Sequence, residues 1–239
     1  MHPQSTQEPR AADEVGLTFH AGEPGERRTT LGKVTRMLGR YAPAARGSSS
    51  TVWRFMPRSE GAADPAKDSF ALKRCPAEPA NGLRCPRTEF TFLSRLSSPL
   101  FPRAIAHGVM ENGDYVVLSE WIEGRNLARN ALDILTDALR NGTYERFCRD
   151  LLAALSQLQA ARIEHSDIWE PNIIVRNDRP VLVDFGWARE AGTPPLNPTL
   201  HQSDDVLAMN QMLMRLGALH DLLLLESQVA ALSPGGRPS

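Results

Sequence analysis

Short runs of β-forming residues dominate the first half of the chain. Their apolar positions predict strands at residues 51–56, 69–75, 104–110 and 115–122. The last two runs are joined by Glu-Asn-Gly-Asp, a sequence typical of a hairpin turn. One short helix is predicted among these strands, because Pro86 precedes a segment with apolar residues at positions 90, 93 and 96.

In the second half of the chain the apolar residues recur every three or four positions. This spacing predicts amphipathic helices at residues 127–140 and 144–162 and a final helix at about 203–225. Between the helices, residues 173–176 and 181–183 read as two short strands separated by the turn residues Asn177 and Asp178. A strand-rich front half and a helical back half predict the α+β class.

The two ends of the chain are polar and rich in turn residues. Residues 1–30 carry almost no large apolar side chains, so we expect a disordered tail there, and a second one at residues 229–239. The first tail reads either as a frayed terminus or as an export address of the kind that secreted effector proteins carry. The sequence leaves these two alternatives open.

Composition and charge narrow the class of protein. The 239 residues carry 27 Lys and Arg against 28 Asp and Glu, a net charge of -1 that argues against nucleic-acid binding. No apolar run is long enough to span a membrane, so we expect a soluble, cytoplasmic protein. The three cysteines lack C-x-x-C spacing, which predicts reduced thiols and neither a disulfide framework nor a structural zinc site.

The strongest chemical signal lies where the helical pattern gives way to the two short strands. It reads His165-Ser-Asp167-Ile-Trp-Glu-Pro-Asn172, followed after the strands by Asp184-Phe-Gly. A hairpin returns its far end beside its beginning, so Asp167, Asn172 and Asp184 are expected to converge. Such oxygen ligands suit Mg²⁺, and a carboxylate left free of metal can accept a hydroxyl proton. This is the chemistry of phosphoryl transfer.

At these residues the chain resembles the protein-kinase-like superfamily. H-S-D-x-x-x-x-N stands where the family has H-R-D-x-x-x-x-N, and D-F-G is intact. The resemblance covers about residues 40–225. It implies a bilobal fold, with an antiparallel sheet lobe containing one helix at residues 31–122 and a reduced helical lobe at residues 123–228. ATP and Mg²⁺ are the implied cofactors.

The resemblance also implies roles for the polar residues of the second lobe. Asp167 would be the catalytic base, and Asn172 and Asp184 would hold the metal. Asp205 would brace the catalytic loop, although Asp204 or a plain helix cap serves this part of the pattern equally well. Turns and helix caps are the ordinary alternative for each of these residues.

Matching positions in the first lobe would hold the nucleotide. Lys73 ends Phe-Ala-Leu-Lys as the family's lysine ends V-A-I-K, and Glu89 would be its ion-pair partner. The phosphate-covering loop retains one glycine among hydroxyl residues: Gly47, Ser48, Ser49 and Ser50. The adenine would contact the side chains of Val52, Ala71 and Ile174 and the backbone of Glu120 and Ile122. A solvated lysine and a serine turn are the ordinary alternatives.

Several positions depart from the family pattern or complete it. Ser166 replaces an arginine that receives a phosphorylated activation loop in many kinases, so we expect no switching by that route. Trp169 replaces a lysine common in Ser/Thr kinases and could contact a sugar or peptide acceptor or cover apolar surface. Ser119 would leave a roomy pocket behind the adenine. The resemblance also places Leu93, His165 and Phe185 in one apolar column.

The sequence therefore favours an ATP-dependent kinase that phosphorylates an acceptor hydroxyl, with a protein Ser/Thr acceptor slightly ahead of a saccharide. The short helical lobe resembles those of bacterial lipopolysaccharide and glycan kinases, aminoglycoside-type phosphotransferases and compact effector kinases. A different class, a nucleotide-binding pseudokinase, is the alternative suggested by the missing glycines and by Trp169. The presence of Lys73, Asp167, Asn172 and Asp184 together weighs against it.

Overall fold

The structure, a computed structural model, describes residues 38–46, 51–57, 69–77, 88–109, 114–194 and 204–232. The chain divides into two compact units. The first unit comprises Met1–Ser94 with Pro102–Trp121, and the second comprises Arg95–Phe101 with Ile122–Ser239. The predicted tail at residues 1–30 lies outside the described residues, whereas 229–232 of the second predicted tail belong to a helix.

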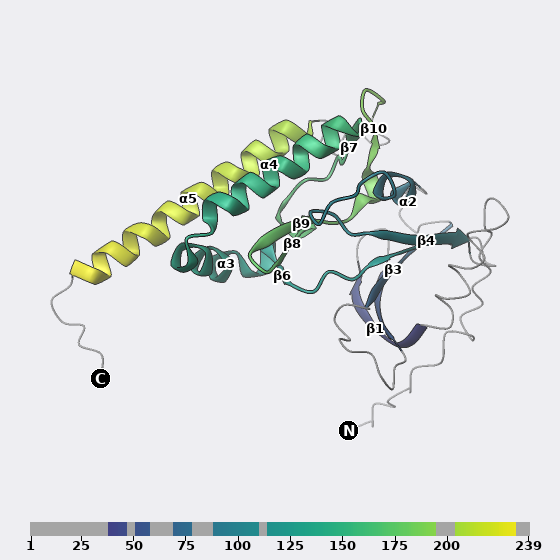
Figure 1. The fold of residues 1–239 in the computed structure, drawn as a ribbon, viewed down its shortest axis with the longest axis horizontal. Helices are drawn as coiled ribbons and strands as arrows, with labels where there is room; N and C mark the ends of the chain where they lie inside the picture. Colours follow the sequence, from purple (N-terminus) through teal and green to yellow (C-terminus); the bar gives the residue numbers. More distant parts are fainter. Residues whose placement is uncertain are drawn as a thin grey trace, which may run out of the picture. The chain divides into compact units, whose positions relative to one another are not determined.

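The first unit is built on a five-stranded antiparallel sheet in the order β1-β2-β3-β5-β4 (Figure 1). Its strands are β1 (Leu38–Arg46), β2 (Thr51–Pro57), β3 (Phe70–Cys75), β4 (Ala104–Val109) and β5 (Tyr115–Glu120). The helix α2 (Glu89–Leu93) packs against β4 and is shorter than the predicted segment. The central position of β3 and β5 explains why their residues are mostly buried, with Val116, Val117 and Leu118 each 1% exposed.

Strand β1 was not predicted from the sequence. It contains Gly39 and Pro43, residues that weaken the pattern of a strand. The strand lies at the edge of the sheet and pairs with β2 alone, with register shifts on both sides of Pro43. An edge strand tolerates proline because one of its sides donates no ladder hydrogen bonds.

The second unit is mainly helical. Three helices, α3 (Leu127–Asn141), α4 (Tyr144–Ala160) and α5 (Asp205–Leu232), contact one another. Against α3 and α4 lies a small sheet of β6 (Arg125–Asn126), β8 (Ile173–Arg176) and β9 (Arg179–Leu182). A two-stranded ribbon joins β7 (Ile163–Glu164) to β10 (Arg189–Glu190). The α+β class is confirmed.

The predicted helices of the second half are present with small changes of boundary. Buried apolar residues from all three helices form the core, among them Leu135, Leu151, Leu158, Met209 and Met212. Helix α5 continues seven residues past its predicted end at Leu225. The turn of the β8–β9 hairpin is formed by Asn177 and Asp178, both with positive φ, as their type allows.

The expectation of reduced cysteines is wrong for Cys75. This residue, at the end of β3, is disulfide-bonded and buried, whereas Cys148 is a free thiol. Absence of C-x-x-C spacing therefore did not exclude a disulfide. Among the described helices, none is long and apolar enough to cross a membrane.

Gly124, just before β6, has no room for a side chain. A Cβ atom at this position would lie 2.4 Å from the backbone oxygen of Val175 in β8. We expect Gly124→Ala to lower the free energy of unfolding by about 1–3 kcal/mol, because a backbone atom would have to move. Chemical denaturation monitored by circular dichroism measures this change.

Gly217 in α5 provides the matched control. A Cβ there would meet its nearest neighbour, the Tyr144 hydroxyl, at 3.6 Å, an ordinary contact. Gly217→Ala should raise the free energy of unfolding by about 0.5–1 kcal/mol, because glycine is unfavourable inside a helix. Equal destabilisation by both substitutions would contradict the close approach of Gly124 to β8.

Candidate active site

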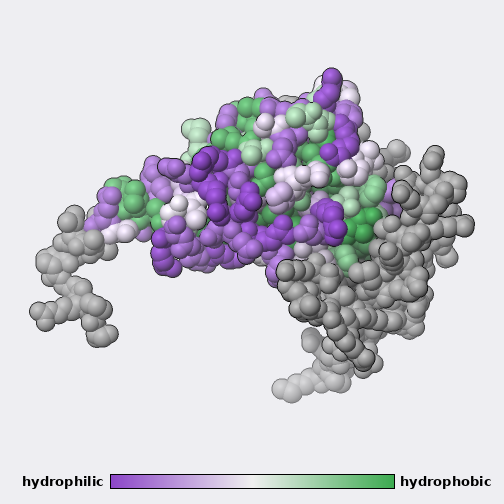
Figure 2. Space-filling model, viewed as in Figure 1, coloured by the Kyte–Doolittle hydropathy of each residue, from purple (hydrophilic) through white to green (hydrophobic). Residues whose placement is uncertain are grey.

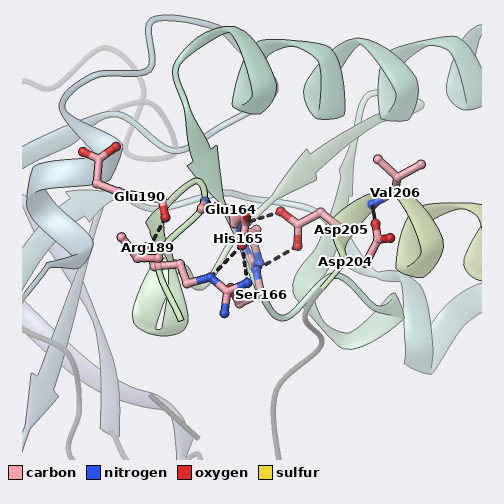
Figure 3. A network of polar contacts seen from close by, with 10 residues as sticks. Glu164, His165, Ser166, Arg189, Glu190, Asp204, Asp205 and Val206 are labelled. Carbon is pink, nitrogen blue, oxygen red and sulfur yellow. Dashed lines mark hydrogen bonds and ion pairs between the residues drawn. The ribbon is translucent and has the colours of Figure 1, made fainter. Parts of the chain in front are cut away.

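The loop between β7 and β8 carries the His-Ser-Asp motif, and the first residue of α5 binds its backbone. The Asp205 carboxylate accepts hydrogen bonds from the backbone N–H groups of His165 and Ser166, the latter at 2.8 Å (Figure 3). Ser166 lies in the left-handed region with φ of 64°, which is unfavourable for a serine. The two hydrogen bonds stabilise this backbone conformation.

The structure shows which of the two adjacent aspartates, Asp204 or Asp205, contacts the loop, a question that the sequence left open. Asp204 accepts hydrogen bonds from the N–H groups of Val206 and Leu207, at 2.9 and 3.0 Å, and so caps α5. Asp205, one residue on, is buried and bonded to the loop instead. The contact expected of a loop brace is therefore made by Asp205.

Asp167 and Asn172 are joined by the side-chain amide of Asn172. Its Nδ2 donates to the backbone oxygen of Asp167 at 2.9 Å and to the carboxylate Oδ2 at 2.8 Å. These bonds fix the orientation of the amide, so that Oδ1 is the end turned away from Asp167. They also fix one oxygen of the Asp167 carboxylate.

Asp184 follows β9 and is brought close to Asn172 by backbone hydrogen bonds. Val183 donates its N–H to the Asn172 oxygen at 2.9 Å, and the Val183 oxygen lies 3.1 Å from His165 Nε2. Asp184 has φ of 65° and accepts from the Gly186 N–H at 3.2 Å. The second unit thus brings the motif residues into one neighbourhood, as the hairpin argument predicts.

The donor atoms at this place fit Mg²⁺. A carboxylate on Asp184 and an amide oxygen on Asn172 are hard ligands, and Mg²⁺ is usually held by one or two such groups together with phosphate and water. Within the described residues there is no group of three or more His, Cys, Asp or Glu that could hold a metal ion. The site is therefore unlike a closed structural metal site built by protein ligands alone.

His165 is a structural residue and not an exposed base. It is fully buried, and its ring packs edge-on with the ring of Phe185, with 4.7 Å between the ring centroids. The rings of Phe185 and Phe101 also pack edge-on, with 5.8 Å between their centroids. Burial lowers the pKa of His165 below its usual value, while burial raises the pKa of the Asp205 carboxyl. Leu93, the third member of the predicted column, is buried in the first unit.

In the first unit, Lys73 and Glu89 form the predicted ion pair. Lys73 Nζ on β3 lies 2.8 Å from Glu89 Oε2 on α2. Both residues are buried, with 8% and 6% of their surfaces exposed. Removing two charges from water costs free energy, so a buried lysine and a buried glutamate are tolerated only when they are well paired.

The remaining predicted nucleotide contacts are distributed over both units. Val52, Ala71 and Glu120 are partly buried in the first unit, and Ile174 is partly buried and Ile122 fully buried in the second. The Glu120 N–H donates to the Arg103 oxygen at 2.9 Å. The loop positions predicted to cover the phosphates, Gly47, Ser48, Ser49 and Ser50, lie outside the described residues.

Sequence reasoning missed the ion pairs that hold the segment after D-F-G. Arg189 on β10 pairs with Glu164 on β7, with Nε at 2.6 Å from Oε2 (Figure 3). The Gly192 N–H donates to the same carboxylate. Glu190 pairs with Arg95. No local pattern reveals these contacts, because their partners are 25 and 95 positions apart.

A second missed contact links α5 to the loop between β7 and β8. Arg215 Nε lies 2.8 Å from Glu170 Oε1. Although partial burial opposes it, the arginine lowers the pKa of the Glu170 carboxyl. Helix α5 therefore holds the loop at two places, through Asp205 before the motif aspartate and through Arg215 after it.

Comparison with known proteins finds a similarity in sequence that is limited to part of the chain. No protein-family model matches the chain. A segment of 82 residues is 34% identical to the serine/threonine-protein kinase PknA of Nostoc sp., covering 34% of this chain and 14% of that kinase. The matched segment of this chain is thus similar in sequence to part of a protein kinase.

The search of solved structures matches one that is described as the apo form of PpkA-294. It is 20% identical to this chain, with a TM-score of 0.46, and the match covers 62% of this chain and 59% of the other. The chain thus spans less than two thirds of each of these proteins.

Asp205 and Asp204 allow a test of the loop brace. We expect Asp205→Ala to release the backbone of His165 and Ser166 and to lower the free energy of unfolding by about 2–4 kcal/mol, because two buried donors lose their acceptor. Asp204→Ala removes only a helix cap and should cost about 1 kcal/mol. Chemical denaturation and amide hydrogen exchange of the loop measure both effects. Equal losses would contradict the assignment of the brace to Asp205.

His165 predicts a pH dependence of stability. Because burial lowers its folded-state pKa below 6.5, the unfolded chain binds the proton more readily, so stability is present above pH 6.5 and is lost as the pH falls. We expect a loss of about 1 kcal/mol between about pH 7.5 and 5.5. His165→Phe should be less stable at neutral pH but show a smaller loss over this range in thermal melts. An unchanged loss would show that another group is responsible.

Proposed function

We propose that the chain is an ATP-dependent phosphotransferase that moves the γ-phosphoryl group of ATP to an acceptor hydroxyl. The observation that carries this proposal is the buried Lys73–Glu89 ion pair, at 2.8 Å, in a sheet of kinase-like topology. A purely structural role does not account for it well, since buried ion pairs stabilise a fold little compared with apolar residues of similar size. A lysine held by a carboxylate is suited to binding phosphate oxygens.

Residues of the second unit supply the chemistry in this proposal. The acceptor hydroxyl donates its proton to the Asp167 carboxylate while its oxygen forms a bond to the γ-phosphorus. The bond between that phosphorus and the bridging oxygen breaks, and ADP leaves. Asn172 and Asp184 would hold Mg²⁺, which when bound neutralises charge on the phosphate oxygens.

For the nucleotide, the proposal keeps the contacts that the resemblance implies. Its phosphates would bind Lys73 and the backbone of the loop formed by Gly47, Ser48, Ser49 and Ser50. The adenine would pack on Val52, Ala71 and Ile174 and bond to the backbone of Glu120 and Ile122. The Glu120 N–H already bonds to Arg103, so we assign the adenine contact at Glu120 to its carbonyl oxygen.

A protein Ser/Thr hydroxyl is the proposed acceptor, supported by Lys73, Glu89 and the intact D-F-G sequence. A saccharide acceptor is the second candidate, and one observation favours it. Trp169, two residues after Asp167, is 45% exposed, and an exposed indole can pack against a sugar ring. Trp169→Ala compared with Trp169→Phe, assayed on casein and on extracted glycans, separates the two acceptor classes.

The contacts of the segment after D-F-G support activity without phosphorylation of this segment. Glu164 supplies a carboxylate to Arg189, and Ser166 stands where an arginine would bind a phosphate. Arg189, which could otherwise bind a phosphate group, is thus already paired within the chain. We propose that the activity is constitutive or controlled by a partner.

Asp184 and Asp178 form a matched pair for testing catalysis. Both have positive φ, 65° and 59°, which asparagine tolerates, so Asp184→Asn and Asp178→Asn should preserve the fold. We expect Asp184→Asn to lower phosphate transfer from Mg-ATP by about a hundredfold or more and Asp178→Asn to leave it unchanged. Equal transfer by wild type and Asp184→Asn, with ATP still bound, would favour a pseudokinase.

A test of Lys73 requires a variant that does not leave the Glu89 carboxylate buried without an ion-pair partner. Lys73→Met alone would leave Glu89 buried and unpaired at a cost of about 3–5 kcal/mol, so the double substitution with Glu89→Gln is preferable. We expect this variant to retain its thermal melting temperature within a few degrees but to lose transfer by orders of magnitude. Retained activity in the folded double variant would contradict a phosphate-binding role for Lys73.

A further inference from the structure

Helix α5 is apolar on two opposite faces. One face enters the core of the second unit through Ala208, Met209, Met212 and Leu216, all at most 3% exposed. The other face is exposed and carries Leu207, Gln211, Met214, Ala218, Leu222 and Leu225. A helix that is apolar on both sides is normally covered on both sides.

The exposed residues form one continuous stripe. Successive helical residues turn by about 100°, so the six positions fall within an arc of roughly 80°. Met214, Leu222 and Leu225 are 75%, 60% and 57% exposed. Figure 2 shows hydrophobic residues on the surface at the C-terminal part of α5. The stripe contains no charged residue, and its spacing of three and four positions is that of a helix-pairing seam.

The residues of the stripe are arranged symmetrically about Ala218. Met214 and Leu222 lie four positions to either side of it, and Gln211 and Leu225 lie seven positions to either side. An antiparallel pair of α5 helices with its two-fold axis at Ala218 would therefore place Met214 opposite Leu222 and the small alanines opposite each other. Small side chains at the crossing allow close approach of the two helices.

The charges beside the stripe are complementary in the same arrangement. Arg215 and Glu226, both exposed, lie on one flank of the stripe. In a two-fold antiparallel pair, this flank faces the same flank of the partner. The flank of one copy that carries Arg215 therefore faces the flank of the other copy that carries Glu226. Arg215 uses Nε for Glu170, which leaves other guanidinium donors for a second carboxylate. On the opposite flank, the Asp221 carboxylate lies 3.2 Å from His220 Nδ1.

We propose that the occupant of the stripe is a second copy of this chain, and that the protein forms an antiparallel dimer through α5. The symmetry of side-chain size and the flanking charges both fit an isologous contact, in which the same patch serves both partners. The dimer helix is also the helix that holds the catalytic loop through Asp205 and Arg215.

Sedimentation equilibrium of the full chain tests association. We expect the average mass to rise from the 26.4 kDa of one chain towards twice that value between micromolar and several hundred micromolar protein. Leu225→Glu should weaken dimerisation about tenfold or more, because it places a charge in the seam. Leu132→Glu on α3 is the matched control, since both leucines are 57% exposed, and it should leave the dissociation constant unchanged.

Thermal melts establish that these variants fold. A chain that remains monomeric throughout the concentration range overturns the proposal and indicates that a different partner or segment covers the stripe. Equal weakening by Leu225→Glu and Leu132→Glu also overturns it, because the contact would then not be specific to α5.

Crosslinking tests the antiparallel arrangement. Under mild oxidation, a mixture of Met214→Cys and Leu222→Cys chains should give a disulfide-linked heterodimer, with the parent chain as the control for the native cysteines. The heterodimer should form faster than the homodimer of Met214→Cys. Preferential Met214→Cys homodimers would indicate parallel helices and contradict the two-fold axis at Ala218.

Discussion

The backbone of the loop that carries His165, Ser166 and Asp167 depends on one buried carboxylate. Asp205 accepts from the N–H groups of His165 and Ser166, and the second of these residues has a left-handed conformation that a serine rarely adopts. Asp167 follows immediately, so its direction depends on this constrained backbone. Because Asp205 is also the first residue of α5, the loop is fixed to a helix that contributes Met209, Met212 and Leu216 to the core of the unit.

Charge is distributed differently in the two units. In the first, Lys73 and Glu89 neutralise each other inside the fold and require a short, well-formed contact between a strand and a helix. In the second, the polar groups of Asp167, Asn172 and Asp184 are ordered by hydrogen bonds to the backbone and to one another. The first arrangement is a buried ion pair, and the second is a set of oxygen atoms ordered by hydrogen bonds.

Elements with a strong local pattern could be predicted from the sequence. The helices α3, α4 and α5 follow from apolar spacing, and the β8–β9 hairpin follows from Asn177 and Asp178 between two apolar runs. Strand β1 could not be predicted in this way, because an edge strand with Pro43 lacks the expected alternation. The disulfide state of Cys75 was predicted wrongly, because spacing in sequence does not report which thiols meet in the fold.

The sequence by itself determined the residue types of the candidate site and their order, because the carboxylates, the amide and the lysine can be read directly from the motifs that contain them. Only the tertiary structure decided which of Asp204 and Asp205 holds the loop, that Glu164 pairs with Arg189, and that α5 leaves an apolar face exposed. Two adjacent aspartates cannot be distinguished by residue type. Their environments differ only in the folded chain, where one lies in solvent and the other is buried. Contacts between distant residues depend in the same way on the packing of whole elements, which local spacing does not specify.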